Sequence, residues 1–325
     1  MKKIFVSFLA VAAMAACTKT EPTYQLEQAE ISLLPTTALS TKGVIDGTVY
    51  PTSENFDVYA YWSDGWKGEP TKYFITPENS GAEFKYSGGS WKGAKTAYHW
   101  PKDGSVKFAA YSPASANLKH TYATDTYYTT GYTQSSKTNE TWDLLLAKTT
   151  ADYTAVTAAN GVPVVFEHAL SWITINVISD VKTSKAFTIT EMTINGVATK
   201  ADLSASMTDG IQYGEWKNQS TPAGYKVFAG EQTVTNTLAK IENNNGGTVV
   251  IPQVPTTLTI KYNQNQLAGT AALPNQQIDL SLALTKDNVW APGRHYTYTI
   301  IFSLDEILIN PSVNDWADSY DYDIL

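Results

Sequence analysis

The 325-residue sequence contains one cysteine, Cys17, and one arginine, Arg294. A single cysteine excludes disulfides within the chain as a source of stability. The lack of an arginine cluster and the formal net charge of −8 argue against nucleic acid as a partner.

Recognisable catalytic chemistry is also missing. The four histidines, at 99, 120, 168 and 295, do not pair at metal-ligand spacing, and no glycine-rich phosphate loop or nucleophile elbow occurs. A catalytic triad assembled in space stays conceivable, but nothing in the sequence singles one out. The terminal aspartates 315, 318, 321 and 323 suit calcium chemically, yet their spacing does not fit an EF-hand loop and favours solvated charges. We therefore expect no enzyme, no metal and no cofactor.

Long apolar runs are confined to the N-terminus. Lys2 and Lys3 precede the apolar run Ile4–Ala16, which is too short to cross a bilayer as a helix. This pattern is typical of a signal peptide, assigned to residues 1–16. Met14-Ala15-Ala16-Cys17 resembles a lipobox, so we expect lipid on Cys17. The alternative is an ordinary cleaved signal with an incidental cysteine.

Lipidation would anchor the mature protein to a membrane without spanning it. Residues 17–29 are polar and are expected to form the lipidated tether. The localisation expected from this segment is the cell outer membrane, with the folded part exposed at the surface.

The rest of the chain favours strands. Twenty tyrosines and nine tryptophans, with abundant threonine, suit pleated sheets. Apolar and polar residues alternate over Phe56–Trp62, Leu258–Tyr262, Ile278–Leu284 and Tyr296–Leu304. Another alternating strand begins at Phe187 and is expected to end at the Asn195-Gly196 turn. No segment carries a sustained helical period with caps, so the predicted class is all-β, with sandwich architecture.

The mature length suggests two domains of ordinary size. The apolar stretch Val162–Ile178 predicts one or two core strands, and the Ser179–Ser184 stretch after it is the predicted boundary. The expected domains are residues 30–180 and 181–325, with no sheet running through both. The side chains expected in the first core are Ile173, Ile175 and Val177, and those expected in the second are Leu280, Leu282, Ile300 and Phe302.

Several stretches, taken in order, resemble the fimbrillins of Bacteroidales, the lipoprotein subunits of type V pili. They follow the lipobox-like segment and span almost the whole mature chain. The matching stretches are Asp143-Leu144-Leu145-Leu146-Ala147, Phe166-Glu167-His168-Ala169-Leu170, Tyr296-Thr297-Tyr298-Thr299-Ile300 and Pro311-Ser312-Val313-Asn314-Asp315-Trp316.

The resemblance implies two tandem transthyretin-like β-sandwich domains after a lipoprotein signal peptide. It also implies cleavage by a trypsin-like protease in the loop behind the first strand, and insertion of another subunit's strand into the vacated groove. Lys42-Gly43 is the matching position, although some members carry Arg there. The alternative is that Lys42 is an ordinary loop lysine. The implied partners are other pilus subunits joined by strand addition, and the implied final location is the fimbrium.

A donor strand must alternate, because strand addition restores the backbone ladder and fills pockets with every second side chain. Tyr320, Tyr322 and Ile324 alternate with aspartates at the chain end. Such a short strand cannot hold a pilus alone, so the donor is expected to extend back to Ile307 and Ile309, with Pro311 marking a break in the ladder. The alternative is that this end pairs inside its own domain or frays.

A second function class is a surface lipoprotein that binds glycans on a host or bacterial surface. Trp62, Trp66, Trp91 and Trp100 lie in or beside glycine-rich loops, and exposed rings among them would stack on sugars. Others among them are expected to be core. His168 is expected to be a satisfied core group, and Trp316 a packing residue.

We predict that Cys17→Ala abolishes acylation and membrane retention, because the sequence offers no other thiol. Metabolic labelling with palmitate measures this directly. Label retained on the mutant protein would show that Cys17 is not the acceptor.

Overall fold

The computed structural model describes residues 29–37, 50–62, 73–75, 81–101, 104–121, 124–136, 142–153, 155–181, 186–207, 211–213, 216–241, 248–266 and 271–315. Strands dominate these residues, which confirms the all-β prediction. Two short helical segments also occur in the described part, η1 (Ala114–Ala116) and α1 (Ala155–Asn160), and neither was expected. No helix among the described residues is long and apolar enough to cross a membrane.

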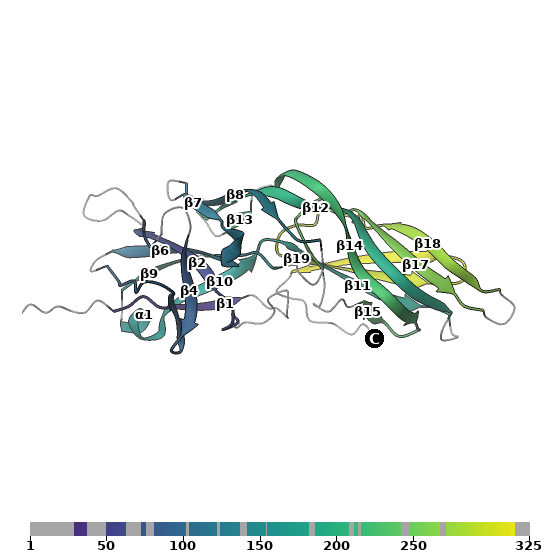
Figure 1. The fold of residues 1–325 in the computed structure, drawn as a ribbon, viewed down its shortest axis with the longest axis horizontal. Coiled ribbons are helices and arrows are strands. Elements are labelled where there is room, and N and C mark those ends of the chain that lie inside the picture. The colour runs from purple at the N-terminus through teal and green to yellow at the C-terminus, as the bar shows by residue number, and fades with distance from the viewer. Residues whose placement is uncertain are drawn as a thin grey trace, which may run out of the picture.

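The first half of the chain forms a sheet that closes on itself, here called the ring sheet (Figure 1). Its strands pair in the order β2-β4-β5-β1-β10-β9-β6, and β6 pairs back to β2, while β3 (Tyr73–Ile75) lies beside β2. The strands of the ring are β1 (Leu33–Thr37), β2 (Phe56–Trp62), β4 (Ala82–Ser87), β5 (Ser90–Gly93), β6 (Ser105–Ser112), β9 (Leu145–Asp152) and β10 (Val162–His168).

Alternation decides which side chains the ring sheet encloses. In β2, Phe56, Val58 and Ala60 point inward and are fully buried. They form the first core with residues of the other ring strands, among them Leu33, Phe84, Trp91, Phe108, Leu145, Val162, Val164 and Phe166. The sequence pattern of β2 therefore predicted both the strand and its buried face.

The β19 sheet covers one side of the second half. Its strands are β15 (Ala239–Ile241), β11 (Ser171–Ser179), β19 (Arg294–Phe302) and β20 (Ile307–Asp315), in that order, with β16 (Thr248–Val250) also paired to β11. β11 and β19 run parallel, so that Ile175 lies beside Tyr298 and Val177 beside Ile300.

This pairing corrects one expectation. Ile173, Ile175 and Val177 pack in the second core, with Leu280, Leu282, Ile300 and Phe302, and not in the first. The physical reason is that β11 pairs with β19, while the preceding strand β10 stays in the ring sheet. The change from first to second core thus falls at the turn between β10 and β11, before the predicted boundary at 180/181.

The shared sheet joins the two halves. Its path is β18-β17-β12-β8-β7, with β13 and β14 also paired to β12. The expectation that no sheet runs through both halves is therefore wrong. The strands of the shared sheet are β7 (Lys119–Thr121), β8 (Thr126–Thr133), β12 (Phe187–Ser206), β13 (Gln212–Tyr213), β14 (Lys217–Val234), β17 (Thr257–Gln264) and β18 (Leu273–Ser281).

β12 is the reason for this sharing. Its first half pairs with β17 and its last half pairs with β8, while β14 accompanies it from Phe187 to Asp202 (Figure 1). The expected end at Asn195-Gly196 is wrong, because the strand continues through that pair. Gly196 has a φ of +67°, and the register shifts between Ile194 and Val197, so the pair forms a bulge instead of a hairpin turn.

A middle core fills the space between the outer face of the ring sheet and the last half of β12. The ring sheet contributes Tyr59, Ala109, Tyr111 and Leu146, whose side chains point away from the first core. The shared sheet contributes Tyr127, Tyr132, Ala201, Leu203 and Ala205. The first half of the chain is therefore also layered, with one sheet packed on another. The division into two domains at 180/181 stays a prediction.

We predict that Leu203→Ala lowers the free energy of unfolding by about 2–5 kcal/mol, because Leu203 is buried in the middle core. Leu273→Ala is the matched control, since Leu273 in β18 is 46% exposed and its truncation should change stability by less than about 0.5 kcal/mol. Denaturant melts measure both. If Leu203→Ala lowers the free energy of unfolding no more than Leu273→Ala does, the burial of Leu203 in the middle core contributes little to stability.

Candidate functional site

The first strand lies between two strands that come later in the chain. β1 runs parallel to β10, with Leu33 beside Val162 and Thr37 beside Phe166. Val162 donates its backbone N–H to the carbonyl of Ser32 at 2.9 Å. Ile31 and Leu33 are 0% and 1% exposed, whereas Leu34, the next residue in β1, is 46% exposed. The strand forms here because its alternating residues fill the inside of the ring sheet.

Residues just before β1 are held by a different segment. The backbone N–H of Ile31 donates to the carbonyl of Tyr98 at 2.7 Å, and that of Trp100 donates to the carbonyl of Ala29 at 3.1 Å. Glu30 forms an ion pair with Lys92 at 2.6 Å. Backbone pairing thus runs from Ala29 to Thr37. This segment precedes all the other strands of the ring sheet in the sequence.

One side of β1 is joined far less extensively than the other. Within the described residues, its pairing with β5 consists of Leu33 opposite Trp91, whereas its pairing with β10 continues from Leu33 to Thr37. The ring sheet therefore has a weak seam between β1 and β5. β1 is therefore held mainly by its ladder to β10, and loss of that ladder would leave it attached to the ring by little backbone pairing.

An aromatic group surrounds the place where β1 packs. The ring of Tyr50 stacks on Phe166 with centroids 5.2 Å apart and meets Phe56 edge-on at 5.4 Å. Its hydroxyl lies 2.8 Å from the hydroxyl of Ser112 and donates to the carbonyl of Asn55. Trp91 lies 6.0 Å from Tyr50, centroid to centroid. These side chains form one wall of an apolar trough that β1 fills.

The predicted processing positions lie beside this strand in sequence. Lys42 and Gly43 follow β1, and Cys17 precedes it, but all three lie outside the described residues. Lipidation of Cys17 and cleavage after Lys42 therefore stay predictions.

The predicted donor strand pairs within its own chain in this structure. Ile307 and Ile309 belong to β20, which pairs antiparallel with β19 along its whole length and is packed, partly buried, against the second core. The expected break at Pro311 is wrong, because Pro311 lies opposite Tyr298 within the ladder. β20 ends the strand order of its sheet, where a proline costs little. Tyr320, Tyr322 and Ile324 lie outside the described residues.

Comparison with known proteins identifies this architecture. A family model described as Fimbrillin-like matches residues 36–316. This chain belongs to the fimbrillin-like family. The match covers most of the sequence, which confirms the resemblance that the short stretches indicated.

Solved structures show the same fold. A fimbrial protein from Bacteroides vulgatus has a TM-score of 0.57 at 15% identity, over 88% of this chain and 99% of that one. A protein from Bacteroides uniformis that is provisionally assigned to cell adhesion has a TM-score of 0.53 at 17% identity, over 88% of this chain and 98% of that one. At such identities the likeness shows the fold alone. Among curated proteins, none matches this chain.

Family membership settles the broad class of function. A fimbrillin-like chain is a pilus-related protein of the cell surface and not an enzyme. In the part of the chain that the structure describes, no three His, Cys, Asp or Glu side chains gather in a group that could hold a metal ion.

Of the four tryptophans proposed as glycan contacts, two are buried and two have side chains outside the described residues. Trp91 and Trp100 are 5% and 1% exposed, so the expectation that they offer sugar-stacking faces is wrong. They lie inside the ring sheet, where Trp100 meets Phe108 edge-on. Trp66 lies outside the described residues, as does the side chain of Trp62 at the end of β2.

Trp142 was not among the proposed contacts, yet it is 54% exposed and lines a hollow. In the sequence, Trp142 stands between the polar stretch 135–141 and the buried strand that begins after Leu144. This position is the feature that could have indicated its exposure.

Two buried polar side chains near the middle core, Asp125 and His168, have hydrogen-bond partners within the fold. Asp125, at a φ of +46°, accepts hydrogen bonds from Tyr61, from Lys148 at 2.6 Å and from His120 at 3.2 Å. Burial opposes ionisation of this carboxyl, but the bonds from His120, Lys148 and Tyr61 outweigh it and hold its pKa well below the usual range. His168 is likewise buried and lies 2.6 Å from Asp143, as expected of a core histidine.

Asp57, a second carboxyl near the middle core, has a pKa that is shifted in the opposite direction. It lies on the outward face of β2 and accepts a hydrogen bond from Tyr111 at 2.8 Å. Burial raises its pKa from 3.8 to about 6, while the Tyr111 bond lowers it and the nearby Glu83 carboxylate raises it further. Because the folded-state pKa lies above the unfolded value, the contribution of Asp57 to stability is fully present below pH 3.8 and is lost as the pH rises through about 6.

We predict that Asp57→Asn removes this pH dependence, since an amide keeps an oxygen for Tyr111 and does not ionise. The difference in free energy of unfolding between wild type and mutant should change in favour of the mutant between about pH 4 and pH 7. Urea melts across this range measure the difference, which cancels the titration of all other groups. A difference that stays constant with pH would contradict the shift assigned to Asp57.

Proposed function

We propose that this protein is a structural subunit or minor adhesin component of a type V pilus, exported as a lipoprotein and assembled by strand exchange after proteolytic removal of β1. The observation that carries the proposal is that β1, the first strand, fills an apolar trough formed entirely by later residues. Cys17 would hold the precursor at the outer membrane, and cleavage after Lys42 would release the mature subunit to the fimbrium.

Cleavage after Lys42 would separate β1 from the rest of the fold. The trough would then expose Val162, Val164 and Phe166 of β10, together with Trp91 of β5, and both neighbouring strands would have open edges. Unpaired edges and buried apolar surface brought into water are both unfavourable. Ile31 and Leu33 each contribute roughly 1.5–3 kcal/mol when fully buried, so a vacated trough favours a replacement strand of similar pattern.

β20 carries that pattern. The inward residues of β1 and the segment before it are Ile31, Leu33 and Pro35, and the inward residues of β20 are Ile307, Ile309 and Pro311. The two sets have the same spacing, an aliphatic pair followed by proline. Because a strand presents every second side chain to one face, β20 of a neighbouring subunit could place equivalent groups in the trough.

The energetic direction of this exchange also favours assembly. In its own sheet, β20 is an edge strand whose Ile307 and Ile309 are only partly buried, and whose Leu308 and Val313 are 48% and 46% exposed. The corresponding residues of β1, Ile31 and Leu33, are buried completely or nearly so. In a vacated trough, Ile307 and Ile309 would therefore be buried more completely than they are in their own sheet. Tyr320, Tyr322 and Ile324 would extend the inserted strand.

We predict that trypsin cleaves the exported protein after Lys42, and that the product, which begins at Gly43, polymerises while Lys42→Ala remains monomeric. A synthetic peptide of residues 29–37 should block polymerisation by refilling the trough, and the same peptide with Leu33→Asn should not. N-terminal sequencing and electron microscopy of the products measure both steps. Assembled chains that still begin at Cys17 would contradict removal of β1.

The same assay tests the donor. Deleting residues 318–325, or introducing Ile309→Asn, should reduce polymer yield from the cleaved protein. The deletion should leave the melting temperature of the uncleaved monomer unchanged. A sharp fall in that temperature with undiminished polymer yield would assign the C-terminal segment to its own subunit and place the donor elsewhere.

A further inference from the structure

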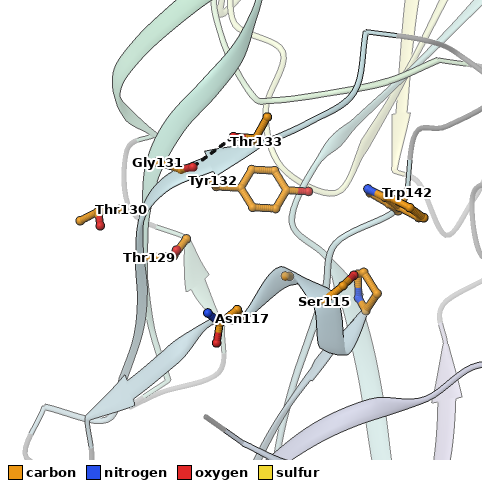
Figure 2. Close-up of a pocket in the computed structure, with 10 residues that line it drawn as sticks. Ser115, Asn117, Thr129, Thr130, Gly131, Tyr132, Thr133 and Trp142 are labelled. Carbon is orange, nitrogen blue, oxygen red and sulfur yellow. Dashed lines mark hydrogen bonds between the residues drawn. The ribbon is translucent and has the colours of Figure 1, made fainter. Parts of the chain in front are cut away.

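A hollow of about 310 Å³ opens on the surface beside the middle core. One wall is the last half of β8, with Thr129, Thr130 and Thr133, and another is the η1 turn, with Ser115 and Asn117. Trp142, which leads into β9, forms a third side (Figure 2). None of these residues belongs to β1, its trough or β20, so the hollow is separate from the surfaces used in the proposed assembly.

The lining that the structure describes combines polar side chains with two aromatic ones. It offers hydroxyl groups of serine and threonine, the amide of Asn117, and two aromatic side chains, Tyr132 and Trp142, with no charged side chain among the described residues that line it. Hydroxyls and amides both donate and accept hydrogen bonds, which matches a ligand that does the same at many positions. An uncharged lining favours a neutral ligand.

Trp142 is the feature that points to a ligand. Among the tryptophans whose side chains the structure describes, it alone is exposed, at 54%, while the others are buried in the cores. The indole face suits flat apolar C–H surface, and its N–H serves as a donor. Figure 2 shows the indole standing at the edge of the hollow, with the hydroxyl of Tyr132 directed toward it.

The backbone of Trp142 is fixed even though its ring is open to solvent. Its carbonyl accepts a hydrogen bond from the amide of Gln134 at 2.9 Å, and Gln134 accepts one from Tyr132 at 2.8 Å. The next residue, Asp143, is held by His168 at 2.6 Å. The opposite wall is also held, since Gly131, at a φ of +68°, donates its N–H to Asp202 at 2.6 Å. Walls held in place reduce the entropy lost when a ligand binds.

We propose that this hollow is a binding site for a short neutral saccharide. A sugar ring would stack its C–H face on Trp142, and its hydroxyls would exchange hydrogen bonds with Thr129, Thr133, Ser115 and Asn117. The volume lies at the low end of the range of about 300–1,000 Å³ for small-ligand pockets, which suits a short ligand. The protein is thereby an adhesin through a site distinct from the tryptophans first expected.

The test uses the uncleaved monomer, so that its result does not depend on strand exchange. Binding of lactose, maltose, mannobiose and N-acetyllactosamine is measured by titration calorimetry and by the shift in tryptophan fluorescence. At least one of these neutral sugars should bind, and Trp142→Ala should weaken it roughly tenfold or more. Asn117→Gly, which keeps the left-handed backbone at φ 49°, should weaken binding through loss of the amide alone.

Tyr128→Ala is the matched control. Tyr128 is an aromatic residue on the same strand, 42% exposed, and does not line the hollow. This variant should bind the sugar as wild type does, and thermal melts should show that all three variants fold. The proposal is overturned if none of the four sugars binds, or if Trp142→Ala binds as tightly as wild type. It is also overturned if Trp142→Ala leaves sugar binding intact and lowers polymer yield, which would make Trp142 a contact between subunits.

Discussion

The parallel pairing of β1 with β10 is the interaction on which the first half of the fold depends. Without it, β10 and β5 would face each other across an open gap, and the first core would be exposed to water. The closure is unequal, because the ladder to β10 is extended while the contact with β5 is one residue pair in the described structure. A ring closed by the first strand of the chain is a structure that proteolysis can open without cutting through its core.

The side chains of β1 pack in the first core and not in the other two. The middle core and the second core contain no residue of β1, and β12 joins them through one sheet. An exchange of β1 for another strand would therefore change the first core alone. In the proposed assembly, this separation would allow a subunit to keep its second core through processing, while the strand in the trough changes from its own to a neighbour's.

Local patterns predicted strands well where inward-facing apolar residues recur at every second position of the sequence. The alternation in β2 and β19 gave both the strand and its inward side chains, because a period of two leaves little ambiguity. The pattern failed at β11, whose burial on both faces says nothing about which sheet it joins. Its partner β19 lies more than a hundred residues away, as Trp172 beside His295 shows, and such pairings leave no local trace.

Turn chemistry misled the prediction for β12. Asn195-Gly196 is a strong hairpin signal, yet here the left-handed glycine is absorbed as a bulge while pairing with β14 and β17 continues on both sides. The candidate sites show the same limit. The buried state of Trp91 and Trp100 and the exposure of Trp142 depend on which neighbours cover each ring, and that is decided by tertiary packing.

The length of β12 determines how force would pass through this protein within a pilus. A strand that pairs with β8 near one end and with β17 near the other ties both regions into one continuous backbone ladder. Tension directed along such a strand loads many hydrogen bonds together, in shear, and does not peel them apart one after another. The register shifts bend and twist β12 locally without ending its pairing with β14, so one continuous strand connects the two halves.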